Sequence, residues 1–191
     1  MYLANSGTTF IIRDSTNSLD TVKRFFESVD AHQMKNIKFV VVGSKTTAET
    51  EKIARNKMPE IQLRFSKTVN DALGATDSGF VAMLSMTDQF VNSYFIRMSR
   101  YLAKAHDISL LCPYEYIRKP GCDRLFMRKD HFLSGILFDN PFTSGCMFSK
   151  QFQKDHNIRY RSEYGEYADY DFWSQFLVKD GKIAFNPVPL V

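Results

Sequence analysis

The sequence predicts one α/β domain, in which a mostly parallel central sheet is flanked by helices and followed by a small antiparallel excursion. In the first 88 residues, apolar strand-like runs alternate four times with segments of helical periodicity. Such alternation is typical of a parallel sheet that carries helices on both faces. The chain has 191 residues and a hydrophobic share of 44%, which suffices for one globular core but not for two domains of ordinary size.

The first two strand–helix pairs carry the clearest patterns. Residues 8–13 (TTFIIR) form a short apolar run, and residues 17–32 place Leu, Val and Phe at helical spacing. Residues 37–43 (IKFVVVG) are continuously apolar, as expected for a central strand that is covered on both faces. Residues 46–57 follow as a polar helix that a threonine caps. We therefore expect two consecutive β-α units.

The third and fourth strands are predicted over residues 61–65 and 79–85, with a short helix over residues 68–76 between them. An amphipathic helix is expected next, over residues 89–106. Asp88 stands between the fourth strand and this helix. Because open α/β sheets bind their ligands just past the carboxyl ends of the strands, Asp88 lies where ligand chemistry is expected.

The second half of the chain has an α+β pattern. Residues 108–119 and 123–129 flank the turn dipeptide Pro120-Gly121, which predicts an antiparallel hairpin outside the parallel sheet. Residues 140–156 begin as a loop and end as a helix. Residues 168–181 form a last helix, whose final glycine stops it, and a last strand follows.

Charge and cysteine content narrow the classes of function. Lys plus Arg exceed Asp plus Glu by 25 − 21 = 4, a mild positive field that fits a local anionic ligand. No basic run is dense enough to predict binding to nucleic acid. The 3 cysteines lack paired spacing, so they predict neither disulfides nor a zinc site, and a reducing compartment follows. No apolar leader or membrane-length window is seen, so we expect a cytoplasmic protein without an integral membrane segment.

The order of these features resembles that of the nucleotide-sugar-dependent glycosyltransferases of the A fold (GT-A), especially the large inverting family 2. The shared features are the β-α-β start, the acidic strand end, the antiparallel excursion and the acidic helix start EYADYDFW. The resemblance covers nearly the whole chain and implies one glycosyltransferase domain over residues 1–191. Residues 1–88 would be its nucleotide-binding half and residues 89–191 its acceptor-side half. Because nothing closes the last strand before Val191, we expect a truncated chain or one module of a longer protein.

The resemblance implies a divalent cation, Mn²⁺ or Mg²⁺, at the end of the fourth strand. Family members end this strand with a line such as G-(D/E)-Y-(I/V)-x-x-L-D-x-D-D, and alignment on Gly79 places the three acidic positions at Met86, Asp88 and Gln89. A hard cation held by carboxylate oxygens bridges a diphosphate and stabilises the leaving group. We expect Asp88 to hold it with the diphosphate and water, and Met86→Asp to tighten it. The alternative is that Asp88 caps the following helix.

A general base is implied near the start of the last helix. The segment SEYGEYADYDFW resembles the E-D-x-x-x-W segment of the family, with Asp169 in the Asp position and Ala168 where Glu is common. Inverting transfer needs one carboxylate to take the proton of the acceptor hydroxyl, and Asp169 is the expected base. Asp171 and Glu166 are rivals at the same helix start. Each carboxylate has the alternative role of capping the helix or complementing its dipole.

Five further residues are expected to contact the nucleotide donor. The stretch FIIRDSTNS resembles the I-I-P-T-Y-N opening that cradles the base in the family, so Arg13 and Asp14 are placed at the base or ribose. The family's V-V-D-D after the second strand corresponds here to VVVGSKTT, where Ser44 supplies no carboxylate. A surface loop is the alternative at both places. Lys67 and Asn70 lie where the family lines the diphosphate, although an exposed lysine is usually only solvated.

The function implied is transfer of a sugar from a nucleotide-diphosphate donor, first of all a UDP-sugar, to a hydroxyl of a saccharide or glycoconjugate, with inversion. This is a hexosyltransferase type of reaction that would serve polysaccharide biosynthesis. A nucleotidyltransferase is a less favoured enzyme class, because it needs a Gly-rich phosphate loop after the first strand and RDSTNS has none. The alternative from another class is a degenerate, non-catalytic domain that binds a saccharide or a partner chain.

Overall fold

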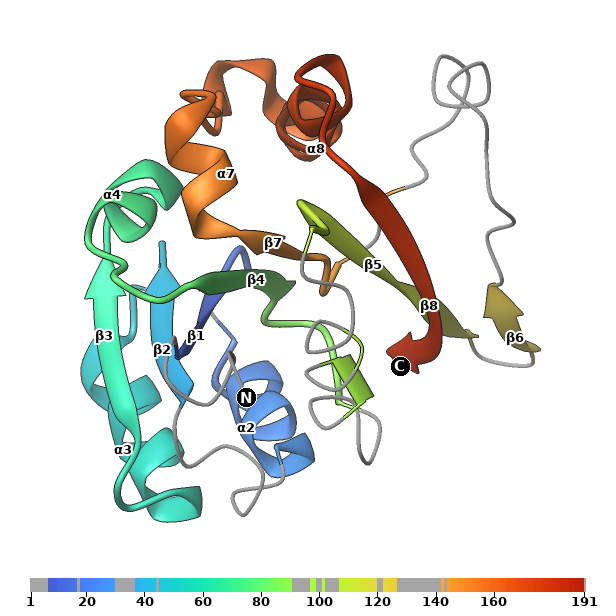
Figure 1. The fold of residues 1–191 in the computed structure, drawn as a ribbon. Helices are drawn as coiled ribbons and strands as arrows, with labels where there is room; N and C mark the ends of the chain where they lie inside the picture. Colours follow the sequence, from blue (N-terminus) through green and yellow to red (C-terminus); the bar gives the residue numbers. More distant parts are fainter. Residues whose placement is uncertain are drawn as a thin grey trace.

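The structure, a computed structural model, describes residues 7–16, 18–29, 37–43, 45–90, 97–98, 101, 107–119, 122–126, 142 and 144–190. These residues form an eight-stranded sheet with helices on both faces (Figure 1). Its strands are β1 (Thr8–Arg13), β2 (Ile37–Val42), β3 (Gln62–Ser66), β4 (Phe80–Ser85), β5 (Leu110–Lys119), β6 (Cys122–Phe126), β7 (Met147–Ser149) and β8 (Ile183–Leu190). The helices are α2 (Leu19–Ser28), α3 (Thr47–Lys57), α4 (Val69–Gly74), α7 (Lys150–Asp155), the 3₁₀ helix η1 (Ser162–Tyr167) and α8 (Ala168–Val178).

The parallel half of the sheet confirms the predicted β-α alternation. Strands β3, β2, β1 and β4 lie side by side in this order, and all neighbouring pairs are parallel. Arg13, the last residue of β1, is in register with Val42 of β2 and Ser85 of β4. The carboxyl ends of these three strands therefore meet at one edge of the sheet.

The antiparallel hairpin was expected outside the parallel sheet, and this expectation is wrong. Strands β5 and β6 do form an antiparallel hairpin, with Lys119 opposite Cys122. However, β7 lies between β4 and β5 and pairs antiparallel with both, so the hairpin belongs to the same sheet. The sequence does not predict β7, because a strand of three residues shows no periodicity and residues 140–156 are expected to begin as a loop and end as a helix.

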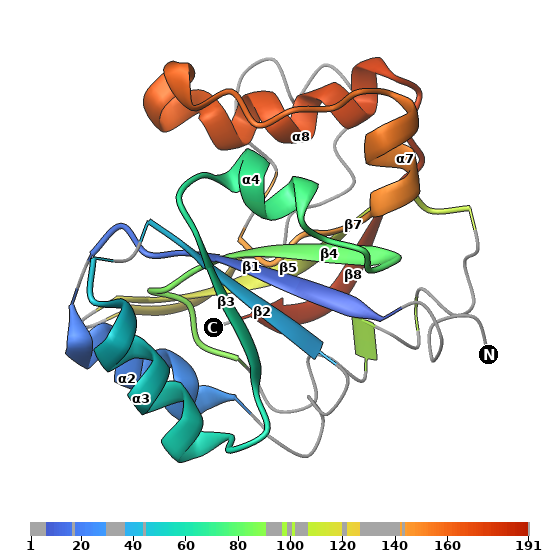
Figure 2. The same ribbon diagram turned by 90° about the vertical axis from the view of Figure 1, so that its left-hand side faces the viewer.

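Helices cover the two faces unequally. Helices α2 and α3 lie against one face, and α4, α7 and α8 lie against the other (Figure 2). Successive side chains of β1 point alternately to the two faces of the sheet. Phe10 and Ile12 pack towards α2, whereas Ile11 packs with Phe172 of α8 and its neighbours. On the α8 side, Phe148 contacts the rings of Phe172, Trp173 and Phe176 at centroid distances of 5.4–5.9 Å. This aromatic layer fixes the start of α8 over the sheet.

Local capping explains where several helices begin and end. Ser18 caps α2 by accepting from the backbone N–H of Thr21, and Thr68 caps α4 by accepting from that of Asp71. After α8 ends, Gly181 packs so closely that a Cβ there would lie 2.5 Å from the carbonyl oxygen of Phe176, which explains the glycine. The helix expected over residues 89–106 lies mostly outside the described residues, of which 97–98 and 101 are helical. No helix in the described part has the length and apolar character needed to cross a membrane.

Candidate active site

Three charged side chains meet at the carboxyl edge of the parallel strands. Arg13 ends β1, Asp88 follows β4 by three residues, and Asp169 lies in the first turn of α8. The edge is held closed between β1 and β4, since the backbone N–H of Met86 donates to the carbonyl of Arg13 at 2.9 Å. The fold therefore brings together the expected metal ligand, the expected base and one expected donor contact, although they are far apart in the sequence.

Asp169 is held by two donors that converge on one of its oxygens. Arg13 forms an ion pair with Oδ1 of Asp169, and the hydroxyl of Tyr160 donates to the same oxygen at 2.8 Å. Arg13 Nη1 also donates to the Tyr160 hydroxyl oxygen at 3.1 Å, which closes a triangle. No described residue donates to Oδ2, and the side chains of Arg13 and Asp169 are 26% and 30% exposed. Asp169 is thus a fixed carboxylate with one oxygen available to solvent or a ligand.

Burial and charge determine the protonation of the two partners of Asp169. Burial lowers the pKa of Arg13, but the nearby Asp169 and Tyr160 more than offset this and raise it, so the guanidinium keeps its charge. Burial is also the main cause that raises the pKa of Tyr160, so its hydroxyl stays protonated and remains a donor. Both groups therefore remain hydrogen-bond donors to Oδ1 of Asp169.

Asp88 closes the turn at the end of β4. Its Oδ2 accepts from the backbone N–H of Ser85 at 2.7 Å and from the hydroxyl of Ser144. Burial raises the pKa of Asp88, which these two hydrogen bonds and the charge of Arg13 oppose, while the charge of Asp169 adds to it. Its described bonds run back to the strand end, and the helix that it was expected to cap lies mostly outside the described residues. The second oxygen, Oδ1, accepts no hydrogen bond from the described residues.

Met86 belongs to the core, so it does not occupy a lost ligand position. Its side chain is 1% exposed and packs in the same buried cluster as Phe10 and Phe90. The burial of Met86 argues against the expectation that a carboxylate at position 86 would reach the cation, because the side chain at this position packs into the core.

We expect Met86→Asp to destabilise the protein instead of tightening a cation. A carboxylate would replace a thioether among aromatic rings, and such a buried, unpaired charge typically costs several kcal/mol, here about 3–5 kcal/mol. Denaturant unfolding of the variant should show this loss, and Met86→Leu is the matched control that keeps the volume. An unchanged unfolding midpoint for Met86→Asp would mean that the side chain can turn to the edge.

Asp14 lies in a corner between the ends of β1 and β2. Its side chain is 4% exposed, and its Oδ1 accepts from the hydroxyl of Thr16 at 3.3 Å. Its backbone N–H donates to the carbonyl of Val42, and Gly43 follows with φ +82°, a conformation that favours glycine. A backbone hydrogen bond thus joins the residues that follow β1 to the end of β2, and the carboxylate of Asp14 is buried at this point. Ser44, the other residue predicted here, lies outside the described residues.

The two residues expected at the diphosphate differ in their surroundings. Lys67 is exposed just before α4. The Asn70 amide of α4 donates to the Tyr160 carbonyl at 2.7 Å and accepts from the Tyr160 N–H at 3.0 Å. Asn70 therefore holds the segment whose tyrosine supports Asp169, and a direct contact of Asn70 or Lys67 with a donor stays a prediction.

The rivals of Asp169 lie away from Arg13. Asp171 accepts two hydrogen bonds from Arg161, at 2.8 and 2.5 Å, and one from Gln175 at 3.0 Å. Glu166 is exposed in the 3₁₀ helix η1. Of the three carboxylates, Asp169 alone contacts Arg13 within the described part of the chain, and its role as a base stays a prediction.

Sequence reasoning missed two residues of the site and one role. Tyr160 and Ser144 sit in irregular segments, and no motif distinguishes them from other hydroxyl-bearing residues. Arg13 was expected to contact the nucleotide, whereas its described partners are Asp169 and Tyr160. These three depend on tertiary contacts that span 9 to 156 positions of sequence, which local patterns do not encode.

The residues around Asp88 fit a cation only if a ligand completes the site. Among the described residues, no group of three or more His, Cys, Asp or Glu side chains could hold a metal ion. Asp88 offers one oxygen that accepts no described hydrogen bond, and Asp169 is paired with Arg13. A hard cation at Asp88 would therefore take most of its oxygen ligands from a diphosphate and water.

Comparison with solved structures identifies the fold. No profile of a known protein family and no curated protein matches the sequence. Residues 1–349 of S. aureus TarS, solved in complex with UDP, are 16% identical with a TM-score of 0.69, over 94% of this chain and 57% of that one. The mannosyltransferase PcManGT from Pyrobaculum calidifontis, solved with GDP-Man and Mn²⁺, is 12% identical with a TM-score of 0.66, over 96% and 56%.

The same architecture also occurs outside the glycosyltransferases. The 4-diphosphocytidyl-2C-methyl-D-erythritol synthase from Anaerococcus prevotii DSM 20548 is 14% identical with a TM-score of 0.62, over 97% of this chain and 90% of that one. This chain spans a little over half the length of the two glycosyltransferase chains. At such identities the likeness shows the fold, and this chain has the GT-A-like fold of the nucleotide-sugar glycosyltransferases.

Proposed function

We propose that this chain is a glycosyltransferase domain that moves a hexosyl group from a nucleotide-diphosphate donor to a hydroxyl of a saccharide or glycoconjugate, with inversion. A UDP-sugar is the donor that we expect first. The observation that carries the proposal is the meeting of Asp88, Arg13 and Asp169 at the carboxyl edge of the sheet. In this scheme residues 1–88 bind the nucleotide and residues 89–191 form the acceptor side.

Asp169 is the proposed general base. Its Oδ2 takes the proton of the acceptor hydroxyl while the hydroxyl oxygen forms a bond to the anomeric carbon. The bond from the anomeric carbon to the diphosphate oxygen breaks on the opposite face, and its electron pair leaves with the diphosphate. Arg13 and Tyr160 hold Oδ1, so Oδ2 keeps one orientation towards the acceptor.

The donor is proposed to lie across the ends of β1, β2 and β4. We assign Asp14 and Ser44 to the base or ribose, and Lys67 and Asn70 to the phosphates. Asp88 would hold Mn²⁺ or Mg²⁺ through Oδ1, and this cation supplies charge that stabilises the leaving diphosphate. PcManGT, which shares the fold, was solved with Mn²⁺ and GDP-Man.

A binding domain without catalysis is the second candidate. The observation that favours it is the ion pair between Arg13 and Asp169, which neutralises the expected base in the absence of substrate. A nucleotidyltransferase shares the fold, but the segment after β1 lacks the Gly-rich loop that such an enzyme needs for its phosphates.

Donor titration tests the proposal. We expect calorimetry to detect binding of UDP-glucose or UDP-N-acetylglucosamine in the presence of Mn²⁺, weaker binding with a chelator, and slow release of UDP as water replaces the acceptor. GDP-mannose serves as the matched donor with another base. Binding of oligosaccharides without any nucleotide-sugar binding would instead support the non-catalytic domain.

A further inference from the structure

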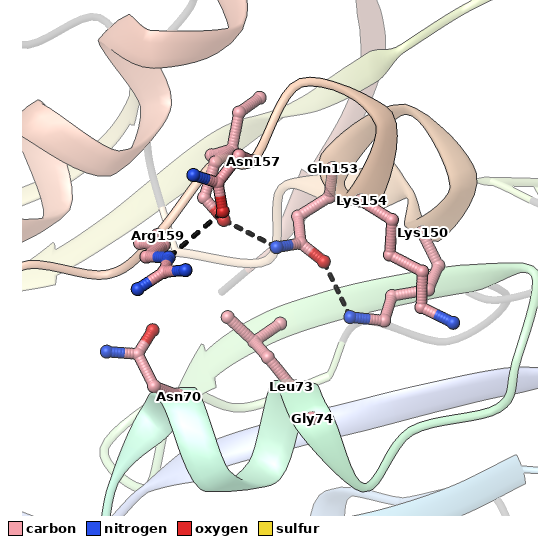
Figure 3. A pocket seen from close by; sticks show the side chains of 9 residues that line it. Asn70, Leu73, Gly74, Lys150, Gln153, Lys154, Asn157 and Arg159 are labelled. Atoms are coloured by element: carbon pink, nitrogen blue, oxygen red, sulfur yellow. Dashed lines mark hydrogen bonds between the residues drawn. The ribbon is translucent and has the colours of Figure 1, made fainter.

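A basic pocket lies between α4 and α7, on the face of the sheet that α8 also covers. It has a volume of about 400 Å³, and Figure 3 shows side chains of α7 extending towards Leu73 and Gly74 of α4. Its lining consists of Asn70, Leu73, Gly74, Lys150, Gln153, Lys154, Asn157, Ile158 and Arg159. Three of these residues are cationic, three are amides and none is acidic.

Lys150 is a buried cation in this pocket. It is 5% exposed, and its ammonium group donates to Oε1 of Gln153 at 2.5 Å. The amide of Gln153 donates in turn to the carbonyl of Ile158, so both side chains are fixed. Burial, with a contribution from Lys154, lowers the pKa of Lys150 to about 8, so at neutral pH most molecules still carry the charge. No carboxylate of the described residues pairs with this ammonium group. Such a buried charge is costly, and an anion would offset that cost.

Lys154 and Arg159 add charge at the mouth of the pocket. Both side chains are exposed, and neither forms an ion pair with a carboxylate in the described part of the chain. Arg159 uses Nε to donate to Asn157 at 3.0 Å, which orients the guanidinium towards Asn70 across the pocket (Figure 3). Its terminal nitrogens make no described hydrogen bond, and a guanidinium edge matches two oxygens of a tetrahedral anion.

We propose that this pocket binds the phosphate group of a small phosphorylated molecule. Lys150, Lys154 and Arg159 line the same pocket and each would attract the phosphate, while Leu73 and Ile158 offer an apolar wall to the rest of the ligand. The backbone N–H of Lys150 donates to the carbonyl of Gly79, at the start of β4, whereas Asp88 follows the end of this strand. Lys150 therefore lies at the opposite end of β4 from Asp88, and Asn70 is the one residue that the pocket lining shares with the proposed donor contacts.

Calorimetric titration with phenyl phosphate at neutral pH and low salt tests the pocket, with phenol as the uncharged matched compound. Phenyl phosphate should bind, and phenol should not. Lys150→Met and Lys154→Met should each weaken binding at least about tenfold, the loss expected for one charged hydrogen bond. Lys57→Met, which removes an exposed lysine of α3 on the other face of the sheet, should leave binding unchanged.

Further measurements distinguish binding in this pocket from general electrostatic attraction and from binding at the proposed donor site. If Lys150→Met fails to fold, the exposed Arg159→Gln gives the same readout. Saturating UDP should not displace phenyl phosphate, and Asp88→Ala should still bind it. No binding by the wild-type protein, equal losses in Lys57→Met, or displacement by UDP would each overturn the proposal.

Discussion

Replacing Asp169 with Asn should lower sugar transfer by about a hundredfold or more while donor binding is preserved, as expected for loss of a general base. An amide has no basic oxygen at neutral pH, so the side chain at position 169 can no longer accept the proton of the acceptor hydroxyl. The fold should persist, because the amide oxygen still accepts from Tyr160 and Arg13. The weaker ion contact should cost about 1–2 kcal/mol of the free energy of unfolding.

The readout is release of UDP from a UDP-sugar, with water or a saccharide as acceptor, alongside calorimetric donor binding. Asp171→Asn is the matched control, since Asp171 lies two residues further along α8 and pairs with Arg161 instead of Arg13. It should lose stability but keep turnover. Full activity of Asp169→Asn, or a large rate loss in Asp171→Asn or Glu166→Gln, would move the base to one of these rivals.

The parallel half of the fold could be predicted because its strands are continuous apolar runs separated by helical periodicity. Strand β1 matches its predicted range, residues 8–13, and β2 and β4 differ from theirs by one residue. Strand β7 could not be predicted, since its three residues gain their partners from β4 and β5 and not from any pattern of their own. The strand pairing that makes the sheet continuous therefore depends on tertiary contacts, which the sequence pattern does not reveal.

The candidate site was predictable to the extent that topology places strand ends together. Asp88 follows a buried strand and Asp169 begins a helix, and both positions follow from local patterns combined with the family resemblance. The orientation of each side chain could not be predicted from these patterns. Met86, for example, lies two residues from Asp88 but packs into the core. The partners Tyr160 and Ser144 depend on how loops close over the sheet, which no periodicity encodes.

Asp88→Ala should abolish the cation-dependent part of donor binding and leave the cation-free affinity almost unchanged. The reason is that the proposed cation joins the Asp88 carboxylate to the diphosphate, so the side chain matters only when the metal is present. Asp88→Ala also removes the hydrogen bonds that close the turn after β4, and this effect on stability is separate from cation binding. Ser85 keeps a partner for its N–H, because it also donates to the Ser144 hydroxyl at 3.0 Å, so the stability cost should be about 1 kcal/mol.

Asp88→Asn separates the cation from the turn. The amide oxygen can still accept from Ser85 or Ser144, so this variant should keep most of its stability, but its neutral amide is a poorer ligand for a hard cation. Both variants should therefore lose cation-dependent binding, whereas only Asp88→Ala should lose measurable stability. Asp77→Ala, which removes an exposed carboxylate before β4, is the control that should retain both.

The pH dependence gives an independent check on Asp88. Burial raises its pKa above 3.8, so the carboxyl keeps its proton to higher pH than an ordinary aspartate. Only the ionised form binds the cation, so cation-dependent donor binding should strengthen as pH rises through the raised pKa. Over the same window the folded state holds this proton more tightly than the unfolded state, so this group's contribution to stability falls as pH rises, and Asp88→Ala should lack that fall. Cation-dependent binding that survives in Asp88→Ala and Asp88→Asn would place the cation elsewhere or show that Asp88 serves only the turn.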